Sequence, residues 1–596
     1  MDQFNSRKDI PEQYRWNLSL VYASSEAWDK DFALIEGVTT EMERFRGNIA
    51  ASPVVLKNAF DTQSKIDLLI EKLYSYAHHL SDEDTRDSTN LGRVGRIASK
   101  AAEVGARLSW MDPELLETPI TTLTDYAKDP QLKDYSRRIE FLIRSKPHQR
   151  SAEVEEILSL ASEALGTAHK AFNLLENADM RFNPIKDSQG KEMEINHSSY
   201  STALESDDRE VRKRAYESYM SGFSQYQNTF AATLEGHVKK QIFYSKVRNF
   251  KTAREASLFS DQIPASVYDG LIDTVHKNLP LLHRWVELKK KLLKLDQIEL
   301  YDLFVPMVKP ANVKLPYEEA MKKVIDGVKP LGSEYVNNLK KAFDERWIDV
   351  YYTTGKRSGA YSGGMFLTHP YILLNHKENL NSAFTLAHEL GHSLHTYYAN
   401  SNQPYSKAGY PIFLAEVAST TNEMLLHFHL FDEAKTPEMK AYLLDHLFTQ
   451  FRGTLFRQVQ FAEFERDIHA LAEKGEPLTA EVLSNHYMAL NQKYYGPQMN
   501  MHPLSRFEWS RIPHFYYNFY VYKYSTSFAA AQYFARKIYD GDNAIREKYL
   551  NFLKSGGSED PLDTLIKAGM DLRDSKPVDA AFQILGNALD EFSKLV

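Results

Sequence analysis

Hydrophobic residues recur along most of the chain at the spacing of an α-helix. Between residues 151 and 165 they stand at i, i+3, i+4 and i+7, which is typical of an amphipathic helix with one buried face. Ser151 is a suitable N-cap, and three glutamates in the next five residues favour the positive end of the helix dipole. Similar patterns fill the first 180 residues and return from Pro264 to Leu293. The pattern predicts a mostly α protein.

Strand signals are few and lie in the middle of the chain. Residues 181–195 read as a hairpin, with Asp-Ser-Gln-Gly as its turn. β-branched and aromatic runs predict further strands at 298–308, 347–352 and 371–374. A glycine-rich loop at 355–364 separates the last two. We expect a small β-sheet just before the segment that carries the chemistry.

The change from helices to strands suggests where the chain divides. No repeat at a fixed period and no low-complexity segment interrupts it. We place the boundary between residues 180 and 200, which gives an N-terminal helical region at 1–190 and a main domain at 191–596.

Composition excludes several classes of function. The 596 residues carry a net charge of −8 and include no cysteine. The charge gives no overall electrostatic basis for binding nucleic acid, and the missing thiols exclude disulfide scaffolds, iron–sulfur clusters and cysteine nucleophiles. We find no apolar leader and no run near the roughly 18 residues that a membrane span requires. We therefore expect a cytoplasmic protein that binds neither nucleic acid nor membrane.

The strongest chemical signal is HELGH at residues 388–392, an HExxH motif. On a helix His388 and His392 lie one turn apart, so both imidazoles can reach one ion, while Glu389 is turned about 100° away. Asn381 or Ser382 can cap that helix, whose apolar stripe is Phe384, Ala387, Leu394 and Tyr398. Two neutral histidines and a carboxylate base match catalytic zinc. The alternative is a helix surface with two hydrogen-bonded histidines and a solvated glutamate.

A catalytic zinc site needs a third protein ligand. The longer motif HExxHxxGxxH is absent, because His395 and Tyr398 occupy its last two fixed positions. Glu416 lies in an apolar stretch, where a carboxylate is costly unless it is paired or bound to a metal. Glu423 follows two helical turns later and can hydrogen-bond a ligating imidazole. Either glutamate can instead be a surface residue.

Several segments together resemble a known family. HELGH, FLAEVASTTNE at 413–423 and IPHFYYNFYVYKY at 512–524 resemble the thimet-oligopeptidase-like zinc metallopeptidases. The opening IPEQYRWNLSLVY and the loop KRSGAYSGG resemble the oligoendopeptidase F subgroup, so the likeness spans nearly the whole chain. HExxH alone would be far less specific than this combination.

The resemblance implies a site and a fold. It implies one Zn²⁺ per chain held by His388, His392 and Glu416, with Glu389 as the general base for a zinc-bound water that attacks the peptide carbonyl. It also implies a two-lobed helical body with a deep channel, in which residues 1–190 form a wall or lid and 191–596 the catalytic domain. Short peptides would enter and folded proteins would not. We expect a monomer or a weak homo-oligomer.

An aromatic segment is the candidate for further substrate contacts. If residues 514–524 form a helix, His514, Tyr517 and Tyr524 fall within about 80° of one another. The family uses a histidine and tyrosines here to bind substrate and stabilise the transition state, and ungapped matching gives these three residues those roles. Val521 stands where thimet-type relatives carry a tyrosine, and Tyr520 is the possible replacement. A tyrosine-rich helix can also be packed core.

The leading hypothesis is a zinc-dependent endopeptidase that hydrolyses internal bonds of short oligopeptides. The alternatives are a peptide-binding scaffold on an inactive fold of this type and a zinc aminopeptidase, and the same ligands also accept cobalt or manganese. The strand at 371–374 is a candidate to pair with an extended peptide. The loop at 355–364 lacks the phosphate-binding pattern and is either a substrate-facing loop or a flexible turn. We expect His395, His427 and His429 to be packing or surface residues.

Overall fold

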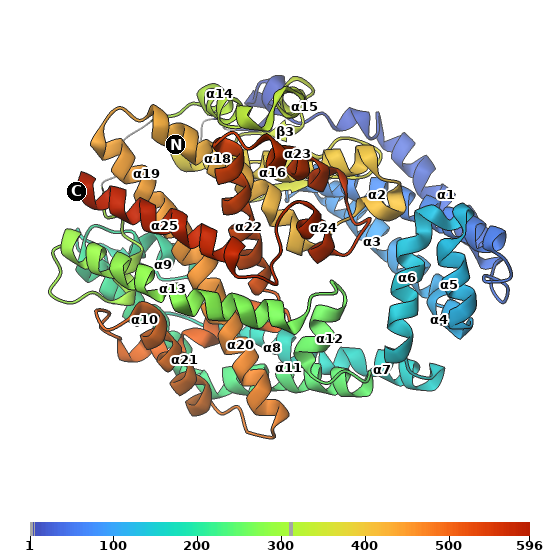
Figure 1. Ribbon diagram of the computed structural model, residues 1–596, viewed down its shortest axis with the longest axis horizontal. Helices are drawn as coiled ribbons and strands as arrows, with labels where there is room; N and C mark the ends of the chain where they lie inside the picture. The colour runs from blue at the N-terminus through green and yellow to red at the C-terminus, as the bar shows by residue number, and fades with distance from the viewer. Residues whose placement is uncertain (1–3, 5, 309–313) are drawn as a thin grey trace. The chain divides into compact units, whose positions relative to one another are not determined.

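The computed structural model describes residue 4, residues 6–308 and residues 314–596. This part of the chain is mostly helical, with α-helices α1 to α25 and short strands β1 to β5 (Figure 1). The predicted mostly α fold with a small sheet is confirmed. The chain forms two compact units. Unit 1 comprises Met1–Pro147, Val313–Asp432 and Phe534–Met570, and unit 2 comprises His148–Asn312, Glu433–Tyr533 and Asp571–Val596.

Unit 1 contains the first six α-helices and the elements around the HExxH motif. Its helices are α1 (Ser25–Glu43), α2 (Pro53–Glu83), α3 (Ser88–Leu108), α4 (Met111–Glu117), α5 (Ile120–Lys128), α6 (Ser136–Ser145), α14 (Tyr317–Gly327), α15 (Ser333–Asp344), α16 (Leu380–Asn402), α17 (Tyr405–Ala408), α18 (Ile412–Glu433), α23 (Asn543–Lys554) and α24 (Pro561–Lys567). α22 (Tyr522–Tyr539) contributes residues to both units.

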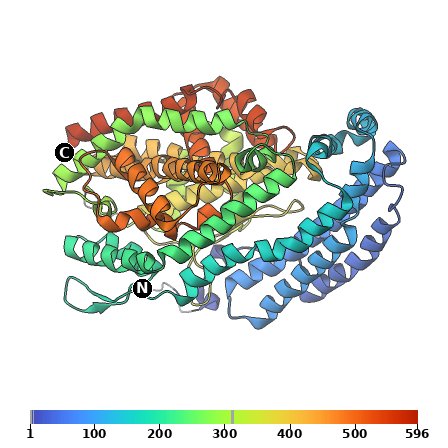
Figure 2. The same cartoon turned by 90° about the horizontal axis from the view of Figure 1, so that it is seen from below.

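Helices α1, α2 and α3 pack side by side in unit 1 (Figure 2). Ser24 and Ser52 cap the first two, each accepting a hydrogen bond from the backbone three residues on. Trp28 of α1 is fully buried, and its indole donates to the Leu73 carbonyl of α2 across 3.0 Å. The hydrophobic core built on these helices continues to Tyr371 and Leu373. The helical region and the strands beside the HExxH motif therefore share one core.

The sheet of unit 1 has the order β3-β5-β4. β3 (Ile348–Asp349) pairs parallel with β5 (Tyr371–Leu373), and β4 (Tyr361–Gly363) pairs antiparallel with the other side of β5. The predicted strands at 347–352 and 371–374 are confirmed, and β4 forms inside the predicted loop. Pairing of a peptide with residues 371–374 is wrong as a prediction, because β5 is central and both of its edges are occupied.

A buried ion-pair network ties the first segment of the chain to this sheet. Asp349 is fully buried, and its carboxylate lies 2.6 Å from Arg7 and 2.7 Å from Lys356. Burial alone would raise the pKa of Asp349, but the two cations hold it below its ordinary value. Arg7 also lies 2.7 Å from Glu83, at the end of α2. The network holds α2, β3 and the loop that begins at Gly355 in one arrangement.

Unit 2 is built from helices and one small hairpin. Its helices are α7 (Ala152–Leu165), α8 (Thr167–Leu174), α9 (His197–Leu204), α10 (Arg209–Gln225), α11 (Gln227–Val247), α12 (Ala253–Phe259), α13 (Ala265–Leu292), α19 (Pro437–Gln450), α20 (Arg457–Glu473), α21 (Ala480–Tyr495) and α25 (Lys576–Leu595). The helices predicted at 151–165 and 264–293 are confirmed. The predicted hairpin is confirmed as β1 (Ile185–Lys186) and β2 (Glu192–Met193).

The strand predicted at residues 298–308 is wrong. Ile298 makes only an isolated bridge to Met499, and a short 3-10 helix, η7 (Leu300–Leu303), follows. Most apolar side chains of this segment are buried, with Tyr301 and Leu303 each 1% exposed, although Phe304 is 40% exposed. The run therefore reflects burial rather than strand pairing, because no neighbouring strand in the described residues extends the bridge.

Among the helices that the structure describes, none combines the length and apolarity of a membrane span. The predicted division near residue 190 and the predicted channel both stay predictions.

Candidate metal centre

The HExxH motif lies in the middle of α16. Asn379 caps this helix, because its side chain accepts a 2.9 Å hydrogen bond from the Ser382 amide. The prediction of Asn381 or Ser382 as the cap is wrong, since both lie in the first turn and Asn379 stands at the necessary three-residue spacing. The predicted apolar stripe is buried as expected and comprises Phe384, Ala387, Leu394 and Tyr398.

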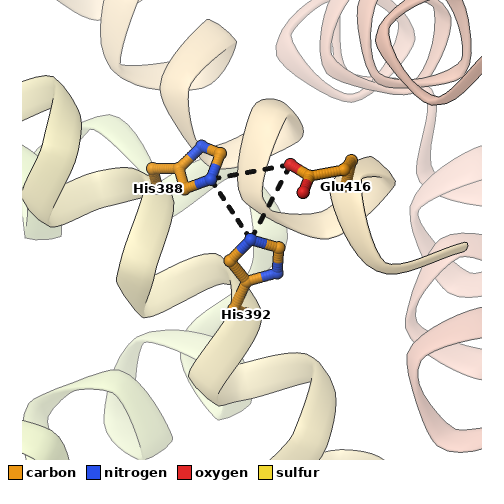
Figure 3. Close-up of side chains that lie close together, drawn as sticks. All are labelled: His388, His392 and Glu416. Atoms are coloured by element: carbon orange, nitrogen blue, oxygen red, sulfur yellow. Dashed lines mark hydrogen bonds and ion pairs between the residues drawn. The ribbon is translucent and has the colours of Figure 1, made fainter. Parts of the chain in front are cut away.

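Three side chains converge on one point from α16 and α18 (Figure 3). The Nε2 atoms of His388 and His392 are 3.2 Å apart, and Glu416 Oε2 lies 3.6 Å from the first and 3.8 Å from the second. Tetrahedral ligands at zinc distances are separated by about 3.3–3.4 Å. A triangle of two imidazole nitrogens and a carboxylate oxygen with sides near this length fits one such ion. In the described part of the chain no other group of three potential ligands meets this way.

Glu423 orients one of the imidazoles. Its Oε1 lies 2.5 Å from Nδ1 of His388, the ring nitrogen that faces away from the triangle. Burial alone would lower the pKa of His388, but the carboxylates of Glu423, Glu389 and Glu416 raise it to about 9. A carboxylate on Nδ1 fixes the ring and increases the basicity of Nε2, as in many metal sites. The predicted contact of Glu423 with a motif histidine is confirmed.

The surroundings of His392 differ from those of His388, because the backbone of Ala415 rather than a glutamate hydrogen-bonds its ring. Burial and the neighbouring His388 lower the pKa of His392 well below its ordinary value, which keeps its ring neutral. A neutral imidazole is the form that donates a lone pair to a metal. His395, on the same helix, is 1% exposed and stacks on Tyr410 with ring centroids 3.7 Å apart. It is a packing residue, as predicted.

Glu389 lies beside the triangle and is buried, with only 7% of its surface exposed. Burial raises the pKa of Glu389 to about 7, and a backbone hydrogen bond from Ser362 of β4 opposes the rise. A carboxylate with a pKa near neutrality can both accept and return a proton. The edge strand β4 therefore contacts Glu389, the HExxH residue that lies outside the triangle and can transfer a proton.

Gly391 allows the two ligand-bearing helices to pack backbone against backbone. A Cβ on this residue would lie 2.5 Å from Ser419 Cα and 2.7 Å from the Ala418 carbonyl oxygen, both on α18. Ser393, two residues on, donates or accepts a 2.7 Å hydrogen bond with Ser362 of β4. The missing side chain at residue 391 thus brings Glu416 within reach of the histidines.

The glycine-rich loop before β4 is held at both ends. Lys356 donates to the Tyr351 carbonyl at 2.8 Å, and the Thr85 amide donates to the Gly355 carbonyl at 2.8 Å. Gly355 has φ +93°, a left-handed conformation that favours glycine, and a Cβ there would press against the Asp84 carboxylate. Tyr361, the first residue of β4, donates to Asp82 at 2.7 Å. The loop is anchored rather than freely flexible, and sequence patterns gave no signal of its partners, which lie at and just after the end of α2.

The aromatic segment of unit 2 is not a single helix. A 3-10 turn, η11 (Pro513–Tyr516), is followed by Asn518 and Phe519, both at φ +54°, and α22 begins only at Tyr522. The helical geometry expected for residues 514–524 is therefore wrong. Non-glycine residues in the left-handed region cost roughly 1–3 kcal/mol each, and such strain persists only where the surroundings impose it.

Four rings of this segment nevertheless gather together. The His514 ring centroid lies 5.6 Å from that of Tyr517, 6.2 Å from Tyr524 and 6.3 Å from Tyr520. Tyr520 and Tyr524 are 5.3 Å apart. Tyr517 is 49% exposed, whereas Val521 is fully buried. We call these four residues the His/Tyr cluster. It includes Tyr520, which helical spacing alone did not place there.

Comparison with known proteins identifies the family. The model of peptidase family M3 matches residues 202–584, and the model described as oligopeptidase F matches residues 114–182. The chain belongs to peptidase family M3. Oligopeptidase PepF of Bacillus subtilis (strain 168) is 42% identical over 596 residues, which cover 100% of this chain and 89% of that protein. An oligoendopeptidase F homolog of Lactococcus lactis subsp. lactis is 39% identical, covering 99% of this chain and 98% of the relative.

A solved M3-type structure supports the same assignment. The crystal structure of oligoendopeptidase-F from Enterococcus faecium is 36% identical, with a TM-score of 0.76, and the match covers 96% of this chain and 99% of that one. Together with the family match, these relatives make this M3 peptidase a metalloendopeptidase of the oligopeptidase F type. The resemblance drawn from the motifs is confirmed.

Proposed function

We propose that this M3 peptidase uses one zinc ion, held by His388, His392 and Glu416, to hydrolyse internal bonds of short oligopeptides. The observation that carries the proposal is the triangle of donor atoms, with sides of 3.2, 3.6 and 3.8 Å. Three protein ligands leave a fourth position of a tetrahedral ion open, as a catalytic site requires. Glu423, hydrogen-bonded to His388, supports the same assignment.

Glu389 is the proposed general base. A zinc ion in this site would acidify a water molecule and polarise the peptide carbonyl. Glu389 accepts the proton of the attacking water on its carboxylate and then delivers it to the nitrogen of the leaving amine. Burial raises the pKa of Glu389 above its ordinary value, which makes its carboxylate a stronger base. The Ser362 amide, which donates to this carboxylate, keeps it oriented.

The outer edge of β4 is the proposed binding surface for the peptide backbone. β4 pairs with β5 on one side, and no described strand pairs with its other side. An extended peptide can add to such an edge through main-chain hydrogen bonds, which do not depend on its side chains. Because Ser362 of β4 contacts Glu389, a peptide bound along this strand would have its scissile bond close to the proposed base. β4 thereby takes the role that sequence analysis gave to residues 371–374.

The His/Tyr cluster is the proposed source of further hydrogen bonds to the substrate. An imidazole and three phenol hydroxyls are the donors that a developing oxyanion needs. We assign His514, Tyr517 and Tyr524 to substrate binding and transition-state stabilisation, and Tyr520 is a further candidate. Their gathering in unit 2 despite the break in helical geometry supports a role beyond core packing.

Short peptides in the cytoplasm are the proposed substrates, admitted by a channel that excludes folded proteins. The test uses an internally quenched peptide of about ten residues, blocked at both ends, with and without phenanthroline. Cleavage at an internal bond that the chelator abolishes and zinc restores is the expected result. Cleavage that needs a free terminus would replace the endopeptidase with an exopeptidase. No cleavage with zinc bound stoichiometrically would leave a peptide-binding role.

A further inference from the structure

In the sequence, the strained pair Asn518–Phe519 stands between Tyr517 and Tyr520, two members of the His/Tyr cluster. Two consecutive non-glycine residues at φ +54° are unusual; asparagine adopts this region more readily than most residues, but the bulky Phe519 does not favour it. Something outside the segment must therefore hold it. The backbone groups of both residues receive such contacts from other helices of unit 2.

The contacts come from α20 and α12. The Phe519 amide donates to Glu465 Oε1 across 2.6 Å, and the Ser257 hydroxyl donates to the Asn518 carbonyl across 2.7 Å. The Phe519 ring is 1% exposed and lies 4.5 Å from the ring of His469. One donor and one acceptor of the strained pair are thus fixed by two different helices, and the Phe519 side chain is enclosed.

Core packing alone does not account for Glu465. Its side chain is fully buried, its Oε1 accepts from the Phe519 amide, and its Oε2 has no hydrogen-bond partner in the described part of the chain. Burial raises the pKa of Glu465 to about 8, and the hydrogen bond from the Phe519 amide opposes the rise. A leucine or methionine would fill the same space without the cost of burying a carboxyl. The one thing the carboxyl adds is an acceptor for the Phe519 amide.

We propose that Glu465, assisted by Ser257, is a positioning residue that holds Asn518 and Phe519 in the left-handed conformation and thereby arranges the His/Tyr cluster for catalysis. This inference rests on the proposed function of that cluster. Without the acceptor, the strained pair would relax toward ordinary backbone angles, and the rings on either side of it would move. The imidazole and hydroxyl donors of the His/Tyr cluster would then no longer point at the substrate.

The test compares two substitutions that differ in one property. Glu465→Gln keeps the shape and a carbonyl acceptor, whereas Glu465→Met keeps the volume and removes the acceptor. We expect Glu465→Met to lower kcat about 10- to 100-fold and to raise KM, because the displaced donors both stabilise the transition state and bind the substrate. Glu465→Gln should keep nearly the wild-type kcat. Zinc content, which depends on residues of unit 1, should be normal in both.

Hydrogen-exchange mass spectrometry gives a readout that does not depend on activity. Peptides spanning residues 513–522 should exchange faster in Glu465→Met than in the wild type or in Glu465→Gln. A wild-type kcat in Glu465→Met, equal losses in both variants, or unchanged exchange would overturn the proposal. If Glu465→Met does not fold, Ser257→Ala decides: faster exchange with a smaller drop in kcat supports the proposal, and no change in either overturns it. A wild type inactive on every blocked peptide would refute the proposed function, while the exchange comparison would still test the role of Glu465.

Discussion

Replacing Gly391 with alanine probes the contact that brings the ligand-bearing helices together. The new methyl group would lie 2.5 Å from Ser419 Cα and 2.7 Å from the Ala418 carbonyl oxygen. Both atoms belong to the backbone of α18, so no side-chain rotation can relieve the clash. The helices must separate by about 1 Å to restore ordinary carbon–carbon contact.

The expected cost follows from that displacement. Overpacking a core with added methyl groups costs about 1–3 kcal/mol, and a rigid backbone neighbour favours the upper end. Metal–ligand distances tolerate only about 0.2 Å. Glu416 moves with α18, so separating the helices competes directly with closing the triangle on an ion. At about 1.4 kcal/mol per tenfold, a cost near 3 kcal/mol lowers zinc affinity about 100-fold.

Zinc affinity is measured by competition with a chromophoric chelator, and the stability of the metal-free protein by calorimetry. Gly95→Ala is the matched control, because Gly95 lies within α3 with no atom within 4 Å of its would-be Cβ. There the same change should stabilise the helix by up to about 1 kcal/mol and leave zinc affinity unaltered. If Gly391→Ala binds zinc within twofold of wild type and keeps its Tm, the added methyl group does not separate α16 from α18. The close contact at Gly391 is then not what brings Glu416 to the histidines.

Three further substitutions separate the roles around the triangle. Glu389→Gln should keep its zinc, measured by metal analysis, and lose about 10²- to 10⁴-fold in kcat; substantial residual activity would remove Glu389 as the base. Glu423→Ala should weaken zinc binding about 10- to 100-fold by releasing the His388 ring, and an unchanged dissociation constant would contradict that orienting role. Ser362→Pro should lower kcat/KM at least about tenfold, because proline has no amide to donate to Glu389. Ser362→Ala, which keeps the amide, is its control, and equal losses in both would shift the effect to the hydroxyl.

Part of the metal centre was predictable because helical periodicity places the candidate residues of each helix on one face. His388 and His392 are four residues apart on α16, and Glu416 and Glu423 are seven apart on α18, so each pair shares a helix face. What spacing could not supply was the packing of one helix on the other. That depends on Gly391, whose significance appears only when the atoms of α18 are known.

The errors arose where distant residues override local preference. A helix through residues 514–524 suits the local sequence, but Glu465 and Ser257 hold a left-handed pair in its middle. The strand at 371–374 was found, but its place in the sheet depends on β3 and β4, which flank it. The run after Ile298 is buried without a neighbouring strand, and strand propensity measures burial as much as pairing.

The contacts between residues 7–17 and the sheet of unit 1 can form only late in synthesis of the chain. The Tyr371 hydroxyl on β5 donates to the Asn17 carbonyl, 354 residues earlier in the chain. At the usual 5–20 residues per second, the ribosome needs roughly 20 to 70 s to make the partner after the earlier residue has emerged. During that interval helices α1 to α6 can pack together, while Arg7 and Trp16 lack the strands they will later contact. Stalled chains that end before residue 340 should be cut readily by protease around residues 7–22, and chains that extend past residue 420 should resist.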